Sequence, residues 1–294
     1  MKIGYFADGP WSHKALDKLL ADKTILISFI CARFDKPDPV LRSLAAAANI
    51  PFFVEKNINS DKFLDTISDF TVDIHVSMSF NQIFRQKLIN QPSLGTINCH
   101  AGKLPYYRGR NILNWALIND EKEFGITVHY MDKGIDTGDI ITQSLLPIDD
   151  QDTYKTLLVR AYEGCANILY ESLKKIQSGT ARRIKQQSIH PMGFYCTARG
   201  PGDEVLDWNQ SSRSIFNFVR AICPPGPAAR TVLKDREIKI NHIALLPNAL
   251  KHKGICGAVL EVDDDGWIVK TADSYVKVTD WEADLKICVG DRLK

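Results

Sequence analysis

The sequence lacks the features that mark membrane, secreted and disulfide-linked proteins. No stretch of its 294 residues approaches the roughly 20 apolar residues of a membrane-spanning helix. Residues 1–8 contain no apolar run of the kind that a signal peptide needs. Seven cysteines are scattered without a Cys-x-x-Cys pair, and no cluster has the spacing of metal ligands. We therefore expect a soluble, cytoplasmic protein with reduced thiols and no bound metal.

The sequence also lacks a strong charge of either sign. Its 37 Lys and Arg residues nearly balance 35 Asp and Glu residues, which leaves a formal net charge of +2. A surface that binds an extended phosphate backbone needs a concentrated excess of basic side chains, so this balance disfavours a nucleic-acid partner. Hydrophobic residues make up 45% of the chain and charged residues 24%, as in ordinary globular proteins. The length favours two domains.

Short β-rich runs alternate with helix-like segments through the first half of the sequence. The β-rich runs are apolar on both faces, which is typical of parallel strands covered by helices on both sides. This pattern predicts an α/β fold with a Rossmann-like, mostly parallel sheet. The expected strands are Lys2–Ala7, Ile25–Phe34, Phe52–Val54, Ile74–Ser79 and Thr96–His100, and the expected helices are Ser12–Ala21, Pro39–Ala48 and Asp61–Ile67.

Longer elements follow, and the pattern changes near Gly179. Apolar spacing predicts a helix at Asn111–Ile118, strands at Gly125–Met131 and Ile140–Leu146, a long helix at Asp152–Gln177, a strand at Arg182–Ser188 and a serine-capped helix at Ser211–Ile222. Short alternating segments follow a proline-rich break and predict a smaller C-terminal β-rich domain, an OB-like barrel or a sandwich. They are Ile238–Ile243, Gly257–Val262, Trp267–Thr271 and Val276–Val278. We place the domains at 1–190 and 229–294, with a linker that contains a short helix at 191–228.

Three polar residues stand out from this frame. Asn98 and His100 lie two residues apart at the end of an expected strand, so their side chains share one face while Cys99 points into the core. Active sites of open α/β sheets lie beyond the carboxyl ends of the strands. Asp136 lies in a glycine-bracketed turn, 134–138, that could bring its carboxylate near His100.

Each of these residues also has an ordinary structural interpretation. A single histidine at a strand end is more often a satisfied structural residue than a catalytic one. Asp136 could belong to a simple turn, because Asp and Gly dominate turns for backbone reasons. Asn98 could cap the loop that follows it. The three residues therefore gain weight only together.

Four ordered motifs resemble the folate-dependent formyltransferase family, which includes methionyl-tRNA, glycinamide ribonucleotide and sugar-nucleotide formyltransferases. They are Asn98-Cys99-His100, Leu104-Pro105-Tyr106-Tyr107-Arg108-Gly109-Arg110, Gly125-Ile126-Thr127-Val128-His129 and Gly134-Ile135-Asp136-Thr137-Gly138. Downstream, Gly202-Asp203-Glu204, Asp207-Trp208, Val219-Arg220-Ala221 and Pro224–Pro227 are similar to the linker and second domain of the aminoarabinose and methionyl-tRNA formyltransferases. The resemblance implies that 1–190 is the catalytic domain and that 10-formyltetrahydrofolate donates the formyl group.

The chemistry of formyl transfer suits the three polar residues. When an amine attacks the formyl carbon, an oxyanion develops, and the Asn98 amide can donate a hydrogen bond to it. His100 can move the proton that the amine loses, since an imidazole titrates near neutral pH. Asp136 would orient the imidazole and favour its protonated form. The resemblance assigns the same roles.

The resemblance also implies two walls for the folate. Backbone groups of Gln82, Ile83 and Phe84 would form one wall, and the turn from Asp132 to Asp136 would form the other. The second wall would include Asp132, Gly134 and Ile135, and Arg110 would lie near the cofactor. Residues 82–84 could instead be an ordinary strand-to-helix connection, and Arg110 could serve the acceptor.

The resemblance places the acceptor near the first loop and the proline-rich loop. The first loop lacks the Gly-x-Gly-x-x-Gly fingerprint of dinucleotide-binding folds, which disfavours a nicotinamide oxidoreductase. It leads into a helix whose free N–H groups could bind a diphosphate, so we assign Gly9, Trp11 and Ser12 to the acceptor. A simple helix-capping turn explains the same residues. In the second loop we assign Lys103 and Tyr107 to the acceptor.

The choice of acceptor depends on the C-terminal domain. Residues 229–294 contain 11 Lys and Arg residues and 11 Asp and Glu residues, so the domain is neutral and a poor RNA platform. The Tyr-Tyr-Arg-Gly-Arg-Asn run of 106–111 also resembles the sugar-nucleotide branch. We expect a dTDP-, UDP- or GDP-linked amino-dideoxy sugar as partner, a role in lipopolysaccharide O-antigen synthesis, no membrane partner, and a C-terminal domain that could form a homodimer.

Other functions remain open on the sequence alone. Methionyl-tRNA formyltransferase has the same triad, and formyltetrahydrofolate hydrolase uses that triad with water as acceptor. A decayed enzyme that survives as a binding module is disfavoured, because Asn98, His100 and Asp136 are all present.

Overall fold

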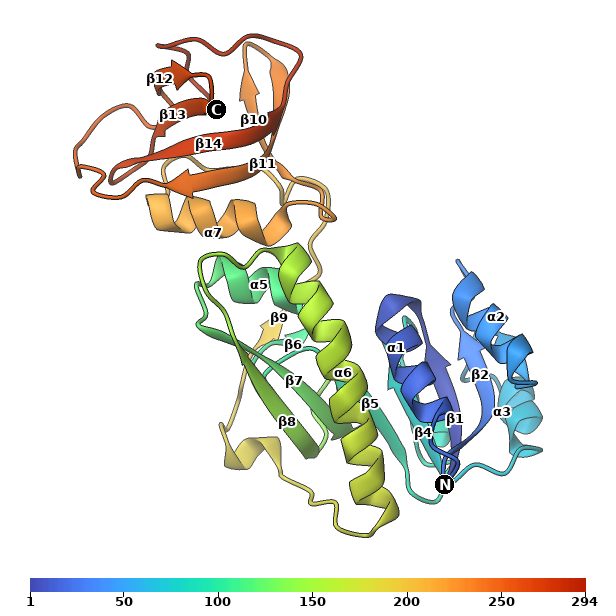
Figure 1. Ribbon diagram of the computed structural model, residues 1–294. Helices are drawn as coiled ribbons and strands as arrows, with labels where there is room; N and C mark the ends of the chain where they lie inside the picture. The colour runs from blue at the N-terminus through green and yellow to red at the C-terminus, as the bar shows by residue number, and fades with distance from the viewer. The chain divides into compact units, whose positions relative to one another are not determined.

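A computed structural model describes residues 1–294, which divide into two compact units (Figure 1). The first unit comprises Met1–Gly109, Phe124–Leu146 and Val159–Cys196, and the second comprises Arg110–Glu123, Pro147–Leu158 and Thr197–Lys294. None of the helices is both long enough and apolar enough to cross a lipid bilayer.

The first unit is built on a seven-stranded sheet in the order β3-β2-β1-β4-β5-β7-β8. Strands β1 to β5 pair in parallel, whereas β7 runs antiparallel to β5. This arrangement confirms the expected mostly parallel, Rossmann-like sheet. The strands are β1 (Lys2–Ala7), β2 (Leu26–Ala32), β3 (Phe52–Val54), β4 (Ile74–Met78), β5 (Thr96–His100), β7 (Glu123–Tyr130) and β8 (Ile140–Pro147).

Helices cover this sheet, and the sequence explains where several of them begin. Asp38 accepts the Val40 and Leu41 amides at the start of its helix, and Ser60 caps the next helix in the same way. Aromatic rings fill the core between sheet and helices: Phe6 makes edge-to-face contacts with the rings of Phe29, Phe63 and Phe84. The helices are α1 (Gly9–Leu20), α2 (Pro39–Ala47), α3 (Asp61–Ser68), α4 (Gln86–Ile89) and α6 (Tyr154–Gln177).

The second unit joins two helices to a five-stranded antiparallel sheet in the order β10-β11-β14-β13-β12. It confirms the expected β-rich C-terminal domain. Ser211 caps α7, as its position predicted, and Trp267 packs edge-to-face on Trp281 inside the sheet. The elements are α5 (Ile112–Ile118), α7 (Ser212–Ile222), β10 (Ala229–Leu233), β11 (Arg236–Leu245), β12 (Val259–Asp263), β13 (Gly266–Lys270) and β14 (Tyr275–Glu282).

The strand expected at Arg182–Ser188 is wrong. Only Ile184 makes a bridge, by exchanging two 2.9 Å backbone hydrogen bonds with Ile140, and the chain then turns into a short 3-10 helix, η1 (Gln186–Ser188). The turn carries the Gln186 side chain into the protein interior, where it is fully buried. Two-residue strands β6 (Arg108–Gly109) and β9 (Tyr195–Cys196) pair nearby, and neither they nor β10 were expected.

Candidate active site

The largely buried carboxylate of Asp136 lies at the centre of the predicted triad. Its Oδ1 atom is 3.4 Å from Nδ2 of Asn98 and 3.5 Å from Nε2 of His129. Its Oδ2 atom is 3.7 Å from Nδ1 of His100 and accepts the Gly109 amide at 2.9 Å. The structure therefore brings Asn98, His100 and Asp136 together and adds a second imidazole and a backbone amide.

The strand register explains this geometry. Asn98 of β5 lies directly opposite His129 of β7, so the alternation of side chains puts Asn98, His100 and His129 on one face. The loop after β7 begins beside the first residue of β5, where the Met131 amide donates to the Thr96 carbonyl at 2.8 Å. The loop then folds back so that its carboxylate reaches the ends of these side chains.

The charge on Asp136 follows from its surroundings. Burial by itself raises the pKa of this carboxyl, but the charge of His100, the hydrogen bond and charge of His129, and the Gly109 amide outweigh burial. The net effect holds the pKa of Asp136 well below its usual value. The cluster therefore contains an ionised carboxylate at neutral pH, placed beside two imidazoles.

The hydrogen bonds of His100 determine which ring nitrogen carries a proton. Its Nε2 atom lies 2.7 Å from the backbone carbonyl of Tyr107, which can only accept, so Nε2 is a donor. Its Nδ1 atom faces Asp136. The imidazole is thus held between a carbonyl and a carboxylate, an arrangement that orients the ring and allows Nδ1 to take up a proton.

His129 is the residue that the sequence interpretation missed. It belongs to one of the four motifs, but no role was assigned to it from the sequence. Its Nδ1 atom lies 2.8 Å from the Tyr130 carbonyl, and its Nε2 atom lies 3.3 Å from Nδ2 of Asn98. The strand register could have identified it, because it places His129 opposite Asn98.

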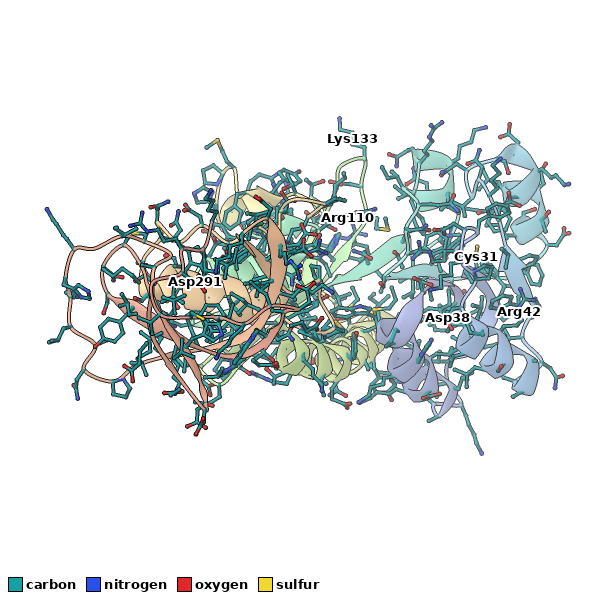
Figure 2. The ribbon with its side chains drawn as sticks, turned by 90° about the horizontal axis from the view of Figure 1, so that it is seen from above. Cys31, Asp38, Arg42, Arg110, Lys133 and Asp291 are labelled. Carbon is teal, nitrogen blue, oxygen red and sulfur yellow. The ribbon has the colours of Figure 1, made fainter.

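The turn expected to form one folate wall has a fixed shape. The Asp132 carboxylate accepts the Gly134 amide at 2.9 Å and the Thr137 hydroxyl at 2.5 Å. A side chain at Gly134 would bring its Cβ within 2.2 Å of the Thr137 hydroxyl, so a larger residue there would displace the Thr137 side chain. Ile135 leaves 53% of its surface exposed, and Figure 2 shows Lys133 pointing outward from the same loop.

The other expected folate wall is largely explained by packing. The Gln82 side chain donates to the Glu55 carbonyl at 2.8 Å and accepts the Ile58 amide at 3.1 Å. Phe84 is buried in the aromatic core. Ile83 is 69% exposed, but its carbonyl accepts from Asn59. Of these three residues, Ile83 has the most exposed side chain.

The first loop does not have the free amides that a diphosphate site needs at Gly9. The Gly9 amide donates to the Asp38 carboxylate at 2.8 Å, which Figure 2 labels between α1 and α2. Ser12 is fully buried, with its hydroxyl bonded to the Gly9 carbonyl at 2.7 Å. Trp11 packs edge-to-face on Tyr162. An anion here would meet a carboxylate that already occupies the helix terminus.

The acceptor residues expected in the second loop differ in exposure. Tyr107 is buried with a positive φ of 57°, and its ring packs on Phe194. The Lys103 backbone lies against β7, where a Cβ at Gly125 would approach its Cα to 2.5 Å. Arg110 is exposed and belongs to the second unit. No group of three or more His, Cys, Asp or Glu residues in the structure could hold a metal ion.

Both parts of the chain match a known protein family. Residues 1–173 match the family model described as formyl transferase, and residues 200–289 match that of the formyl transferase C-terminal domain. A methionyl-tRNA formyltransferase of Halothermothrix orenii is 33% identical over 291 residues, which cover 95% of this chain and 91% of that protein.

Two further similar proteins are not methionyl-tRNA formyltransferases. The bifunctional polymyxin resistance protein ArnA of Wigglesworthia glossinidia brevipalpis is 38% identical over 191 residues, which cover 65% of this chain but only 29% of ArnA. The structure of WlaRD, a sugar 3N-formyltransferase solved with dTDP and 5-N-formyl-THF, has a TM-score of 0.71 and 22% identity over 97% of this chain and 99% of that one. The matches confirm the resemblance carried by the four motifs: the chain belongs to the formyl transferase family.

Proposed function

We propose that this formyltransferase moves the formyl group of 10-formyltetrahydrofolate to the primary amine of a nucleotide-linked amino-dideoxy sugar. The observation that carries the reaction is the ionised Asp136 carboxylate, which lies 3.7 Å from His100 and 3.4 Å from Asn98. These are the groups that acyl transfer to an amine needs: a proton acceptor, a charge that stabilises its protonated form, and an oxyanion donor.

The reaction proceeds in two steps. The amine nitrogen forms a bond to the formyl carbon, and the carbonyl electrons move to oxygen, where the Asn98 amide donates to the developing charge. His100 takes the proton that the amine loses, and Asp136 stabilises the imidazolium. The carbon–N10 bond then breaks, and His100 returns the proton to N10. The products are an N-formyl sugar and tetrahydrofolate.

In this proposal the folate donor lies against residues that follow β4 and β7, the strands on either side of β5. Ile83 follows β4 and Ile135 precedes Asp136, and both are exposed apolar side chains that suit the flat face of a pterin. The turn shape fixed by Asp132 and Gly134 supports this wall. The packing of Gln82 and Phe84 makes them supports for Ile83 in this proposal.

An aromatic surface in the first unit supports a nucleotide-linked acceptor. Tyr106 makes tilted ring contacts with His190 and Phe194, and Phe194 also packs on Tyr107, whose carbonyl holds His100. Phe194 and its neighbour Tyr195 are 40% and 54% exposed. Exposed rings stack on a single base, worth about 1–3 kcal/mol. This surface is linked directly to the triad.

Charge also supports a small acceptor. The 11 basic residues of 229–294 are balanced by 11 acidic residues, and Asp263-Asp264-Asp265 is an acidic run. Such a surface has little net attraction for an RNA backbone. Because the Gly9 amide is already bonded to Asp38, this proposal places the nucleotide outside the first loop. Gly9 and Ser12 then only shape the start of α1.

A specific observation favours a second candidate, methionyl-tRNA formyltransferase. The Halothermothrix orenii relative with that activity matches both domains at 33% identity, whereas ArnA matches over 191 residues. The test is competition between acceptors: formyl transfer is measured with initiator methionyl-tRNA and with dTDP-, UDP- and GDP-linked amino sugars. We expect transfer to one sugar, with binding that changes little with salt. Transfer to the tRNA alone, with a steep salt dependence, would establish the second candidate.

A further inference from the structure

We propose that Gln186 is a positioning residue: it holds the backbone of the Asp136 turn, and Arg108 fixes the orientation of the Gln186 amide. This inference rests on the proposed role of Asp136 in formyl transfer. It concerns how the carboxylate is aimed at His100.

Gln186 is fully buried in η1, and both ends of its amide are used. Its NH₂ group donates to the backbone carbonyls of Asp136 at 2.7 Å and of Gly138 at 2.8 Å. These two carbonyls bracket the turn that carries the carboxylate. The Gln186 side chain, which is far from the turn in the sequence, therefore holds the turn from the protein interior.

The turn needs such outside support because its backbone is strained. Asp136 has a φ of 54°, a left-handed conformation that a residue other than glycine adopts only when its surroundings hold it there. Gly138 packs so closely that a Cβ would come within 1.8 Å of the Tyr130 carbonyl. Without the Gln186 donors, the turn can relax and move the carboxylate away from His100.

Arg108 determines which way the Gln186 amide points. Its Nε and Nη2 atoms both donate to the Gln186 Oε1 atom, at 3.0 and 2.7 Å, and its Nη1 atom donates to the Met192 carbonyl at 3.0 Å. The guanidinium has no acceptor, so the amide oxygen must face it and the NH₂ group must face the turn. The next residue, Gly109, donates its own amide to the Asp136 carboxylate at 2.9 Å. Arg108 thus acts through Gln186 on the backbone of Asp136, while the Gly109 amide holds the Asp136 carboxylate.

The test uses two variants and a matched control. Gln186→Met keeps the volume but removes the donors. Gln186→Glu keeps an acceptor for Arg108 but places oxygen against the two carbonyls, so it separates positioning from folding. Gln187, exposed on the same short helix, provides the control Gln187→Met. Asp136→Asn gives the reference effect of losing the carboxylate.

We expect both Gln186 variants to lower kcat by about 10- to 100-fold with the folate KM within about twofold, because small misplacements of a catalytic group have effects of this size. Histidine NMR without acceptor should show the His100 ring signals of both variants displaced toward those of Asp136→Asn. His129 and the Arg108 charge, which also lie near this turn, are retained. Gln187→Met should match the wild type in both measurements.

Two results would overturn the inference. If Asp136→Asn is slow while Gln186→Glu has wild-type kcat and His100 signals, the turn does not need Gln186. If kcat falls in Gln186→Glu only in proportion to a loss of folded protein, the residue is structural. Wild-type transfer by Asp136→Asn itself would instead contradict the proposed function.

Discussion

Two places in the first unit contain the same three chemical groups: a carboxylate, a histidine and a glycine amide. At the start of α1, Asp38 accepts the Gly9 amide at 2.8 Å and lies 2.7 Å from Nε2 of His13. On the face of β5 and β7, Asp136 accepts the Gly109 amide and faces His100. Residue types alone therefore do not show which carboxylate–histidine pair is catalytic.

The difference lies in how completely each carboxylate is bonded. Asp38 also accepts the first amides of α2, from Val40 and Leu41, so its oxygens are saturated by short bonds. The pKa of Asp38 is lowered despite burial, mainly by the Leu41 amide and the His13 hydrogen bond. Asp136 instead faces two imidazoles at 3.5 and 3.7 Å, distances that can shorten when a substrate binds. A saturated carboxylate stabilises helices, whereas a loosely bonded one can assist a proton transfer.

The largest expected effect comes from the histidines of the two pairs. His100→Asn should lower kcat by about 100- to 10,000-fold, because the imidazole is the only proposed carrier of the proton. His13→Asn is the matched control and should retain wild-type kcat. Steady-state formyl transfer measures both, with folate binding as a check on folding. Equal losses in the two variants would remove the distinction between the pairs.

A histidine without a carboxylate extends the comparison to stability. His75 of β4 is buried between Phe6 and Phe29, its Nδ1 atom has no partner, and burial lowers its pKa to about 4. The unfolded chain binds a proton near pH 6.5, so His75 destabilises the fold as the pH falls from about 6.5 to 4, by about 3 kcal/mol.

Denaturant unfolding at several pH values measures this effect. His75→Leu should be less sensitive to acid than the wild type by about that amount over the same range. Identical pH profiles for the two proteins would show that the His75 ring can be protonated without cost to the fold.

Asp136→Asn and Asp38→Asn sharpen the comparison from the carboxylate side. We expect Asp136→Asn to lower kcat by about 10- to 100-fold and to move the acidic limb of the rate–pH profile to lower pH, because the imidazolium loses a neighbouring negative charge. Asp38→Asn should leave the profile in place and lower the melting temperature, since it weakens two helix caps. An unshifted profile in Asp136→Asn would make that carboxylate structural and direct attention to Asp139.

The smallest expected effect concerns His129. His129→Gln keeps a polar group beside Asn98 and Asp136 but removes the second imidazole, and we expect kcat to fall by about 3- to 10-fold. Single-turnover formyl transfer resolves a change of this size. A loss as large as that of His100→Asn would make His129 the proton carrier instead.

The sequence predicted well what depends on local periodicity. The period of two at Asn98 and His100 gave the shared face, and the Asp136 turn followed from its glycines. His129 was missed because its partner, Asn98, is 31 residues away and becomes visible only with the antiparallel register. The occupied Gly9 amide was missed for the same reason, since Asp38 lies 29 residues away.

The error at Arg182–Ser188 has a physical origin of a different kind. The segment was expected to be a strand, but its Gln186 amide is buried and donates to two carbonyls of the Asp136 turn. Tertiary hydrogen bonds of this sort leave no periodic signal, and they override local preference. The β-rich C-terminal domain was predicted because its strands alternate regularly, whereas β10 was missed beside the proline-rich break.

The most direct test of the account is a double-mutant cycle between His100 and Asp136, measured by single-turnover formyl transfer. The carboxylate is proposed to act through the imidazole, so Asp136→Asn should have almost no effect on the residual rate of His100→Asn. The same cycle between His13 and Asp38 should show no effect on the rate at any corner. Independent, multiplicative losses for His100 and Asp136 would contradict the account, because they would show that the carboxylate does not work through that ring.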